Sequence, residues 1–418
     1  MDLELMTGVN LHVLPTTQFQ ITRLMVTFTT KHDGQNAAAR NLLANVLSTS
    51  SAKYPTQTAL ARHLATLYGA TMGAYVSRLS KAHVMRFKSS FINDEIAGEA
   101  LFPKVLALLQ EIIFNPLLVK ESFDSETVAL QQTNVVNTLR SWDDDKQFYA
   151  LRQVEELYYQ HDAAMKVPGT GTADQVAAVT MADLVATYQS MLANDQIDIY
   201  VVGKIDEEAV KEAVLALPWQ PRAKQVIPAR YVAGKQPVRK QEEVQPVAQT
   251  KFDQTYNLPI YFGDDLYYAA LVMNGILGGT PYSLLFTNVR EKASLAYYAS
   301  TSLRPFNGHL VLQTGIETQN LAQVRELVQT QIDLLQAGEF SAETLKMVQA
   351  TLINQHQANL DRSNARLEQL ILRNTAHVAA NPHFEADIMA VTKEQVVAVA
   401  KQLSLQTEYV LVGGKADD

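Results

Sequence analysis

The amino-acid sequence predicts an α+β fold that is built twice, as two similar domains that each combine an antiparallel-rich sheet with a helical layer. The first observation behind this prediction is a repeat. Residues 178–192 and 197–206 resemble residues 390–403 and 408–417, almost half of the 418-residue chain further on. Each copy has the pattern of a capped helix followed by a β-branched strand. The predicted helix caps and strand ends are Thr180, Thr392, Gly203 and Gly413.

A second repeat indicates the same plan. Residues 58–91 and 282–316 each show a helical period, a short break, and then two strands of period two joined by a turn. Long amphipathic stretches follow in both halves, and we expect helices in them. These stretches are 97–115 and 119–160 in the first half, and 320–338 and 341–379 in the second half.

The segment 216–246 separates the two halves and is predicted to be a linker. Its prolines forbid a continuous helix, and charged residues replace core residues there. We therefore place the first domain at 1–215 and the second at 247–418. Two similar lobes on an extended tether suggest a clamshell, whose cleft is the default ligand site. The prolines are Pro218, Pro221, Pro228, Pro237 and Pro246.

The composition excludes several classes of function. With 47% hydrophobic residues and a net charge of −8, the chain has a full core and no basic patch for nucleic acid. It has no cysteine, which excludes disulfides, a thiol nucleophile and a thiolate metal site. No apolar run approaches the roughly 18 residues that cross a bilayer, and the N-terminus lacks the pattern of a secretory signal. We therefore expect a cytoplasmic protein without nucleic-acid or membrane partners.

Motifs for metal and nucleophilic chemistry are also missing from the sequence. None of the nine histidines has another three or four residues away, and neither HExxH nor HxxEH occurs. There is no G-x-S-x-G motif and no phosphate-binding glycine loop. The three aspartates in "WDDDK" (142–146) fit a solvated helix start or turn better than a cation site. We expect no metal and no cofactor.

The stretch "LFTNVREKASLAYYASTS" (285–302) contains the most pointed candidates for binding. Arg290 ends an amphipathic helix, and Tyr297 lies near the start of the next strand. A guanidinium can bind a peptide carbonyl or carboxylate through two parallel hydrogen bonds, and a phenol can donate to a carbonyl oxygen. The spacing alone favours the other interpretation, a surface arginine in an ion pair and a half-buried strand tyrosine. From the residues alone, both interpretations stay open.

The whole chain resembles the insulinase-like M16 metallopeptidase family, which includes the mitochondrial processing peptidase. The stretch "LGGTPYSLLFTNVREKASLAYYAS" is similar to that family's second-domain signature. The resemblance implies two αβ domains of the LuxS/MPP-like metallohydrolase type that form one half of a clamshell. It also implies a substrate-binding role for Arg290 and Tyr297. The chain departs from the pattern at Ala293 and Ser294, where the family usually has a basic residue and a glycine.

The same resemblance assigns a lost metal site to "ARNLLANVLSTS" (39–50). Active members carry HxxEH there, and this chain has Asn41 and Asn45 in place of the histidines and Ala44 in place of the glutamate base. The helix expected to supply a third, acidic ligand reads "TVALQQTNVVNTLRS" (127–141), without a carboxylate. Asparagine is a poor zinc ligand, and alanine cannot accept a proton from water. We expect the chain to be inactive alone.

The resemblance implies a non-catalytic subunit of a heterodimeric M16-type zinc peptidase. Its partner would be a zinc-bearing paralogue, its ligand a peptide, and alone it could form a homodimer. "NVREKASLAYYAS" and "DDDKQFYALRQ" are similar to a bacterial branch of the family that is associated with 5-aminopentanol modification of elongation factor P. Two alternatives stay open: a peptide-binding or scaffold protein with no part in proteolysis, and an enzyme with an unconventional metal.

Overall fold

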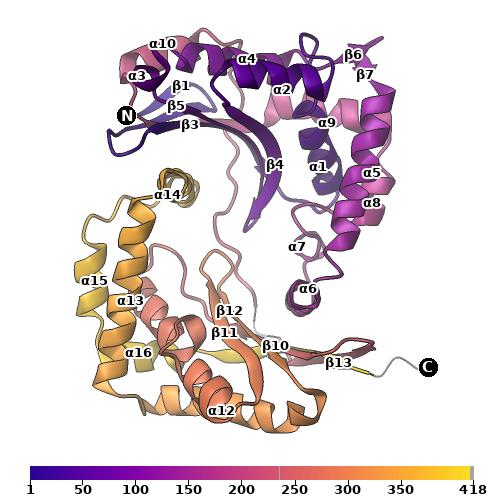
Figure 1. Cartoon of the computed structure of the whole chain (residues 1–418). Helices are drawn as coiled ribbons and strands as arrows, with labels where there is room; N and C mark the ends of the chain where they lie inside the picture. The colour runs from indigo at the N-terminus through magenta and orange to yellow at the C-terminus, as the bar shows by residue number, and fades with distance from the viewer. Residues whose placement is uncertain (235, 415–418) are drawn as a thin grey trace. The chain divides into compact units, whose positions relative to one another are not determined.

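The computed structural model describes residues 1–234 and 236–414 and divides them into two compact units (Figure 1). The first unit consists of Met1–Arg140, Ala163–Ala229 and Leu360–Leu372. The second consists of Ser141–Asp162 and the described residues of 230–359 and 373–414. Each unit therefore contains one segment from the opposite half of the sequence.

The first unit is built on a six-stranded sheet with the strand order β1-β2-β8-β3-β5-β4. Neighbouring strands are antiparallel except β2 and β8, which are parallel. A separate two-stranded hairpin is formed by β6 and β7. The strands are β1 (Asp2–Met6), β2 (Val9–Pro15), β3 (Ile21–Lys31), β4 (Thr71–Leu79), β5 (Ala82–Ile92), β6 (Leu118–Val119), β7 (Ser122–Phe123) and β8 (Gln196–Gly203).

Helices cover one face of this sheet, with α2 and α4 above it in Figure 1. Alternate residues of β3, such as Leu24 and Phe28, point to this face and are fully buried against the apolar side of α4. The helices of the first unit, on either face, are α1 (Asn36–Leu47), α2 (Gln57–Thr66), α3 (Asp94–Ala97), α4 (Phe102–Phe114), α5 (Ser125–Ser141), α7 (Ala163–Lys166), α8 (Ala173–Ala177), α9 (Met181–Asn194), α10 (Glu207–Leu215) and α14 (Ser363–Ala376).

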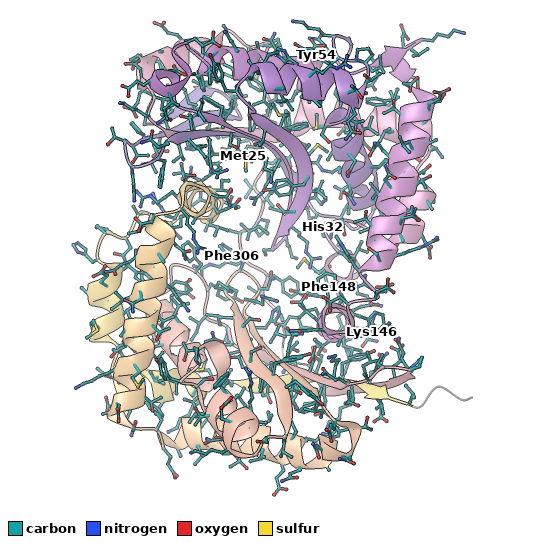
Figure 2. The ribbon with its side chains drawn as sticks, in the orientation of Figure 1. Met25, His32, Tyr54, Lys146, Phe148 and Phe306 are labelled. Atoms are coloured by element: carbon teal, nitrogen blue, oxygen red, sulfur yellow. The ribbon has the colours of Figure 1, made fainter. Side chains whose placement is uncertain are left out.

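The opposite face of the first sheet is covered by α14, a helix from the second half of the sequence. Met25 on β3 and Tyr200 on β8 pack against Leu367 and Ile371 of α14, and Figure 2 shows Met25 between the sheet and this helix. Arg86 Nη1 forms an ion pair with Glu368 Oε2 at 2.7 Å. The first sheet is thus buried on both faces.

The second unit is built on a five-stranded sheet with the order β11-β12-β10-β13-β9. Only β13 and β9 are parallel. The strands are β9 (Arg239–Gln245), β10 (Thr250–Asn257), β11 (Ala296–Arg304), β12 (His309–Ile316) and β13 (Ser404–Gly413). The helices are α6 (Lys146–Tyr158), α11 (Tyr267–Asn274), α12 (Leu321–Ala337), α13 (Ala342–Leu360), α15 (Phe384–Ala390) and α16 (Lys393–Ala400), with two π-helical segments, η1 (Gly275–Gly279) and η2 (Leu285–Lys292), and a 3₁₀ turn, η3 (Thr318–Asn320).

One face of the second sheet is covered by α6, which comes from the first half of the sequence. Ala150 and Val154 of α6 are fully buried against Val311 and Tyr409 of the sheet. Glu155 on α6 also contacts His309 and Arg304; burial alone would raise the pKa of Glu155, but these two partners lower it to about 2. The two halves of the chain therefore exchange a helix.

The two sheets confirm the predicted duplication. Strands β2, β8, β3, β5 and β4 of the first sheet correspond in order to β9, β13, β10, β12 and β11 of the second, and the parallel pair has the same place in both. Thr180 and Thr392, the predicted caps, both form capping boxes. Gln132 and Gln349 make the same contacts, each donating to three backbone carbonyls at a helix end.

Two long stretches that we expected to be helical are interrupted. The stretch 119–160 contains the β6–β7 hairpin, α5 and α6, because Asp145 caps a new helix by accepting from the N–H groups of Gln147 and Phe148. This result confirms the helix-start interpretation of the three aspartates. The stretch 341–379 divides into α13 and α14. The segment 216–246 contains β9, whose charged residues did not indicate a strand.

The described part of the chain has no helix that is both long and apolar enough to cross a membrane.

The Gln349 amide provides a test of the fold. We expect Gln349→Ala to lower the free energy of unfolding by about 1–3 kcal/mol, because the carbonyls of Ile388 and Val391 at the C-terminal end of α15 lose their donor. Gln355→Ala, an exposed change on the same helix, should stay within about 0.5 kcal/mol of the wild type. Urea unfolding of the purified variants measures both, and equal stabilities would contradict the role assigned to Gln349.

Candidate functional site

The predicted remnant of a metal site lies on α1 in the first unit. Leu42, Leu43 and Leu47 bury the helix in the core, and Ala44 is buried with them. Asn41 is buried and Asn45 half-buried. The helix lies where the sequence predicted it.

The two asparagine amides on α1 are engaged by hydrogen bonds. Asn45 Nδ2 donates to the backbone oxygen of Asn41 at 2.9 Å and to its side-chain oxygen at 3.3 Å. Asn41 Nδ2 donates in turn to the carbonyl of Thr170 at 3.1 Å. Both amide groups therefore donate hydrogen bonds to oxygen atoms of the protein itself.

These residues do not fit a zinc ion. Zinc is held by imidazole, thiolate or carboxylate groups, and α1 offers two neutral amides and a methyl group. The helix expected to supply a third ligand, α5, presents Gln132, whose amide instead donates to Val176 and Val179 carbonyls at 2.9 and 3.0 Å. Within residues 1–234 and 236–414, no three His, Cys, Asp or Glu side chains are grouped closely enough to hold one metal ion.

A buried polar network beside α1 was not predicted from the sequence. Arg40 Nη1 forms an ion pair with Asp195 Oδ2 at 2.6 Å, and Arg40 Nε donates to His83 Nδ1 at 2.9 Å. All three side chains are almost completely buried. Burial, together with the positive charge of Arg40, holds the pKa of His83 well below its usual value. No local spacing signals this network, because its members come from α1, β5 and the end of α9.

The same region holds the segment 163–171 against the helix. His83 Nε2 donates to the carbonyl of Gly169 at 2.7 Å, and His32 Nε2 lies 2.9 Å from the carbonyl of Ala164. The two rings stack at 5.8 Å, and Figure 2 labels His32 just after β3. Arg78 Nη1 donates to the carbonyls of Met165 and Val167. With Asn41, these side chains fix the backbone that lies over the N-terminal half of α1.

Arg290, the first residue predicted to bind substrate, lies on η2 in the second unit. Its side chain is 43% exposed, and the guanidinium carbon lies 4.7 Å from the centroid of the Phe286 ring. Its ion pair with the neighbouring Glu291 is long, at 3.7 Å, and such exposed pairs contribute little. The guanidinium is therefore accessible and is supported by an aromatic ring.

Tyr297, the second predicted residue, is displaced outward by a β-bulge. On β11, Ala296 faces Ile316 and Tyr298 faces Gly315, so Tyr297 is the extra residue between them. A Cβ atom at position 315 would collide with the Tyr298 ring, so glycine there lets that ring pack inward. Tyr297 is 55% exposed, which differs from the half-buried strand tyrosine of the alternative interpretation.

The connection between Arg290 and Tyr297 contains a strained residue. Ser294 has a φ of +54°, in the left-handed region that glycine favours. The turn is closed by hydrogen bonds from Ala293 N to Asn288 O at 3.2 Å and from Leu295 N to Val289 O at 3.1 Å. The departure from the family pattern at Ser294 therefore keeps the backbone conformation that glycine would adopt, at a cost in strain.

A glycine and the π-helical segments bring η1 close to β11. A Cβ at Gly278 would lie 2.7 Å from the backbone nitrogen of Thr301, so only glycine allows this approach. Segments η1 and η2 are π-helical, a geometry often found at functional sites. The structure thus places Arg290 and Tyr297 in one unit, at the two ends of a short turn, and places Asn41, Ala44 and Asn45 in the other unit.

Comparison with known proteins gives a matching family model, similar protein sequences, and a similar solved structure. The model of the family described as "Peptidase M16 inactive domain" matches residues 178–352. The chain is 30% identical over 411 residues to "Probable inactive metalloprotease YmfF" of Bacillus subtilis (strain 168), covering 97% of this chain and 96% of the relative. It is 26% identical over 156 residues to "Uncharacterized zinc protease YmxG" of the same organism, covering 36% of this chain and 37% of that protein.

A solved structure matches the whole fold. The crystal structure of a conserved protein from Enterococcus faecalis V583 is 36% identical, covers 100% of this chain and 99% of its own, and superposes with a TM-score of 0.95.

The conformation of Ser294 can be tested by substitution. Ser294→Gly should match or exceed the wild type in free energy of unfolding, because glycine adopts a φ of +54° without strain. Ser294→Val should lower it by about 1–2 kcal/mol, because a β-branched side chain is strained in this region. Chemical denaturation compares the two, and a valine variant as stable as the glycine variant would exclude the left-handed conformation.

The low pKa of His83 predicts a dependence of stability on pH. Below about pH 6.5 the unfolded chain binds a proton at His83 that the folded chain does not bind, so folding weakens as the pH falls. This residue should contribute a slope of about 1.4 kcal/mol per pH unit below pH 6.5, and none above it. His83→Gln should remove this slope, whereas His383→Gln, an exposed change, should retain it. Urea unfolding at pH 7.5, 6.5 and 5.5 measures it; identical slopes in His83→Gln and the wild type would contradict the assignment.

Proposed function

The chain belongs to the M16 peptidase family as an inactive-type homologue, and we propose that it is the non-catalytic subunit of a two-chain M16-type zinc peptidase. The observation that carries the proposal is the exposed pair Arg290 and Tyr297, displayed beside a turn with a strained Ser294. Exposed, weakly paired groups on a rigid support are typical of binding residues.

The first unit supports the non-catalytic half of this proposal. Peptide hydrolysis by zinc needs a metal that acidifies water and a base that takes its proton. At the positions that resemble HxxEH, Asn41 and Asn45 donate to backbone and amide oxygens, and Ala44 has no acceptor. Arg40 next to them is committed to Asp195 and His83. None of these groups can replace the zinc or the base.

The second unit supports the binding half. The Arg290 guanidinium can donate two parallel hydrogen bonds to a peptide carbonyl or to a C-terminal carboxylate. The Tyr297 phenol can donate a further bond to a carbonyl oxygen along the same extended peptide. In this account the two side chains bind and orient the peptide, and the zinc and its activated water belong to the partner chain.

The partner is proposed to be a zinc-bearing paralogue. The similarity of this chain to both an inactive metalloprotease and a zinc protease of Bacillus subtilis supports the coexistence of two such chains in one cell. A location in the cytoplasm, and a link to the 5-aminopentanol modification of elongation factor P, extend the proposal and rest on the sequence resemblance alone.

A second function fits the same exposed pair. Arg290 and Tyr297 could capture a peptide in a binding or scaffold protein that has no part in proteolysis. The two functions differ in one respect: only a peptidase subunit changes the rate of cleavage when it joins the zinc-bearing chain.

The test compares peptide cleavage by this chain, by the zinc-bearing relative, and by their mixture. We expect activity only in the mixture, and Arg290→Ala should lower its kcat/KM about 10- to 100-fold, because a charge-assisted hydrogen bond to the peptide is lost. Lys292→Ala, two residues away and also exposed, is the matched control and should have little effect.

Three results would count against the proposal. Chelator-sensitive cleavage by this chain alone would show a metal site of its own. Unchanged cleavage by the Arg290→Ala mixture would exclude the binding role. A mixture no faster than the relative alone, with peptide still bound by this chain, would favour the scaffold.

A further inference from the structure

The open edge of the second sheet differs from the matching edge of the first. In the first sheet, β2 is covered on its outer side by β1, which pairs with it antiparallel. The corresponding strand of the second sheet is β9, and it pairs with β13 alone among the strands of the described residues. The duplicated plan thus has one strand position that is filled in the first unit and open in the second.

The outward-facing backbone groups of β9 can be identified. The carbonyl of Gln245 accepts from Gly414 N at 3.0 Å, so the peptide groups of Gln245 point toward β13. Because these groups alternate along a strand, those of Lys240, Glu242 and Val244 point away from the sheet. An added antiparallel strand would pair with these donors and acceptors.

The sequence of this edge is complementary to itself in antiparallel pairing. Residues 238–244 read Val-Arg-Lys-Gln-Glu-Glu-Val. With Gln241 opposite Gln241 of a second copy, Arg239 faces Glu243, Lys240 faces Glu242, and Val238 faces Val244. Each pair occurs twice by symmetry, and opposite charges or apolar side chains in cross-strand pairs are stabilising.

The side chains on one face of the edge are available for this pairing. Val238 and Val244 are 48% and 66% exposed, and Lys240 and Glu242 are exposed as well. Lys240 Nζ lies 3.5 Å from Glu408 Oε1, a contact that it can leave because Arg325 Nη2 holds the same carboxylate oxygen at 3.1 Å. The two valines would lose exposed apolar surface at both ends of the pairing.

The side chains on the other face hold the strand in place. Glu243 accepts hydrogen bonds from the hydroxyl groups of Tyr149, at 3.0 Å, and Tyr409, at 2.6 Å. Arg239 donates to the Leu157 carbonyl at 3.3 Å and also contacts His161. A strand fixed in this way loses little conformational entropy when a second strand binds.

We propose that the chain forms a two-fold symmetric dimer in which two copies of β9 pair antiparallel and join their five-stranded sheets into one. Charged residues usually keep edge strands from pairing. Along β9, however, positive side chains precede negative ones, so a strand with another order of charges would meet like charges, whereas a second copy of β9 in this register meets opposite charges. The proposed pairing uses only residues 238–244 of each copy, so we expect a weak dimer with a dissociation constant in the micromolar range. The inference does not depend on the proposed peptidase role.

The first test measures the mass of the full chain by analytical ultracentrifugation over a range of concentrations. Glu242→Lys places a new lysine side chain of each copy opposite Lys240 of the other, and this like-charge contact should weaken the dimer at least about tenfold. Glu339→Lys, the same charge change at an exposed position outside β9, should leave it intact. Adding Lys240→Glu to Glu242→Lys restores opposite charges and should recover the dimer.

The second test uses the absence of cysteine from the chain. At the two-fold axis, Gln241 would face itself in a pair whose Cα atoms lie about 4.5 Å apart, within reach of a disulfide. Gln241→Cys should therefore cross-link into a covalent dimer under mild oxidation. Val244→Cys, whose two copies would be about 20 Å apart, should not.

The two tests distinguish a chain that does not dimerise from a dimer that pairs in another register. A wild-type chain that stays monomeric at about 100 μM, well above a micromolar dissociation constant, would overturn the dimer. A dimer that Glu242→Lys does not weaken, or that cross-links equally through Val244→Cys, would overturn this register. Thermal unfolding of each variant shows whether it is folded, and the cysteine variants test the pairing without a change of charge.

Discussion

The amides of α1 in the first unit are engaged in hydrogen bonds with other protein groups, and the account of this molecule depends on those bonds. The Asn45 amide donates a hydrogen bond to Asn41, and the Asn41 amide donates one to the carbonyl of Thr170. Both amides are therefore bonded to other groups of the protein. The buried network of Arg40, His83 and Asp195 holds the same segment, because His83 also donates to the carbonyl of Gly169. This helix, which resembles a zinc-binding element, offers two amides that bond to protein groups and the methyl group of Ala44, and none of these is a zinc ligand or a base.

The second unit contains the exposed residues to which we assign the binding role. Its π-helical segments, the turn at Ser294 and the bulge at Tyr297 are all local departures from ideal geometry, and departures of this kind are usually kept for function. They display a guanidinium and a phenol that make few contacts of their own. The two units thus share one sheet plan but differ in the local geometry around these residues.

The sequence predicted the parts of this molecule that depend on local pattern. Thr180 and Thr392 were recognisable as caps because a hydroxyl precedes each helix, and the repeated helix-strand units predicted two similar sheets. Residues Arg290 and Tyr297 were singled out from the chemistry of their side chains, and the resemblance to the family then assigned them a substrate-binding role. Whether they and Asn41, Ala44 and Asn45 have the assigned roles stays a prediction.

Other features have no local signal. The exchange of α6 and α14 depends on packing between distant segments, and amphipathic helices look alike whichever sheet they cover. Strand β9 was not predicted, because an edge strand needs no alternation of apolar residues and its many charged residues are also typical of a linker. The Arg40–His83–Asp195 network joins residues that are far apart in the sequence.

The most direct test of the central claim is the zinc content of the purified chain, measured by mass spectrometry of the metal after incubation with zinc and removal of the excess. The account predicts no zinc above background, and the same result for Asn41→Ala. About one tightly held zinc per chain, lost in Asn41→Ala, would contradict it, because α1 would then still be a metal site.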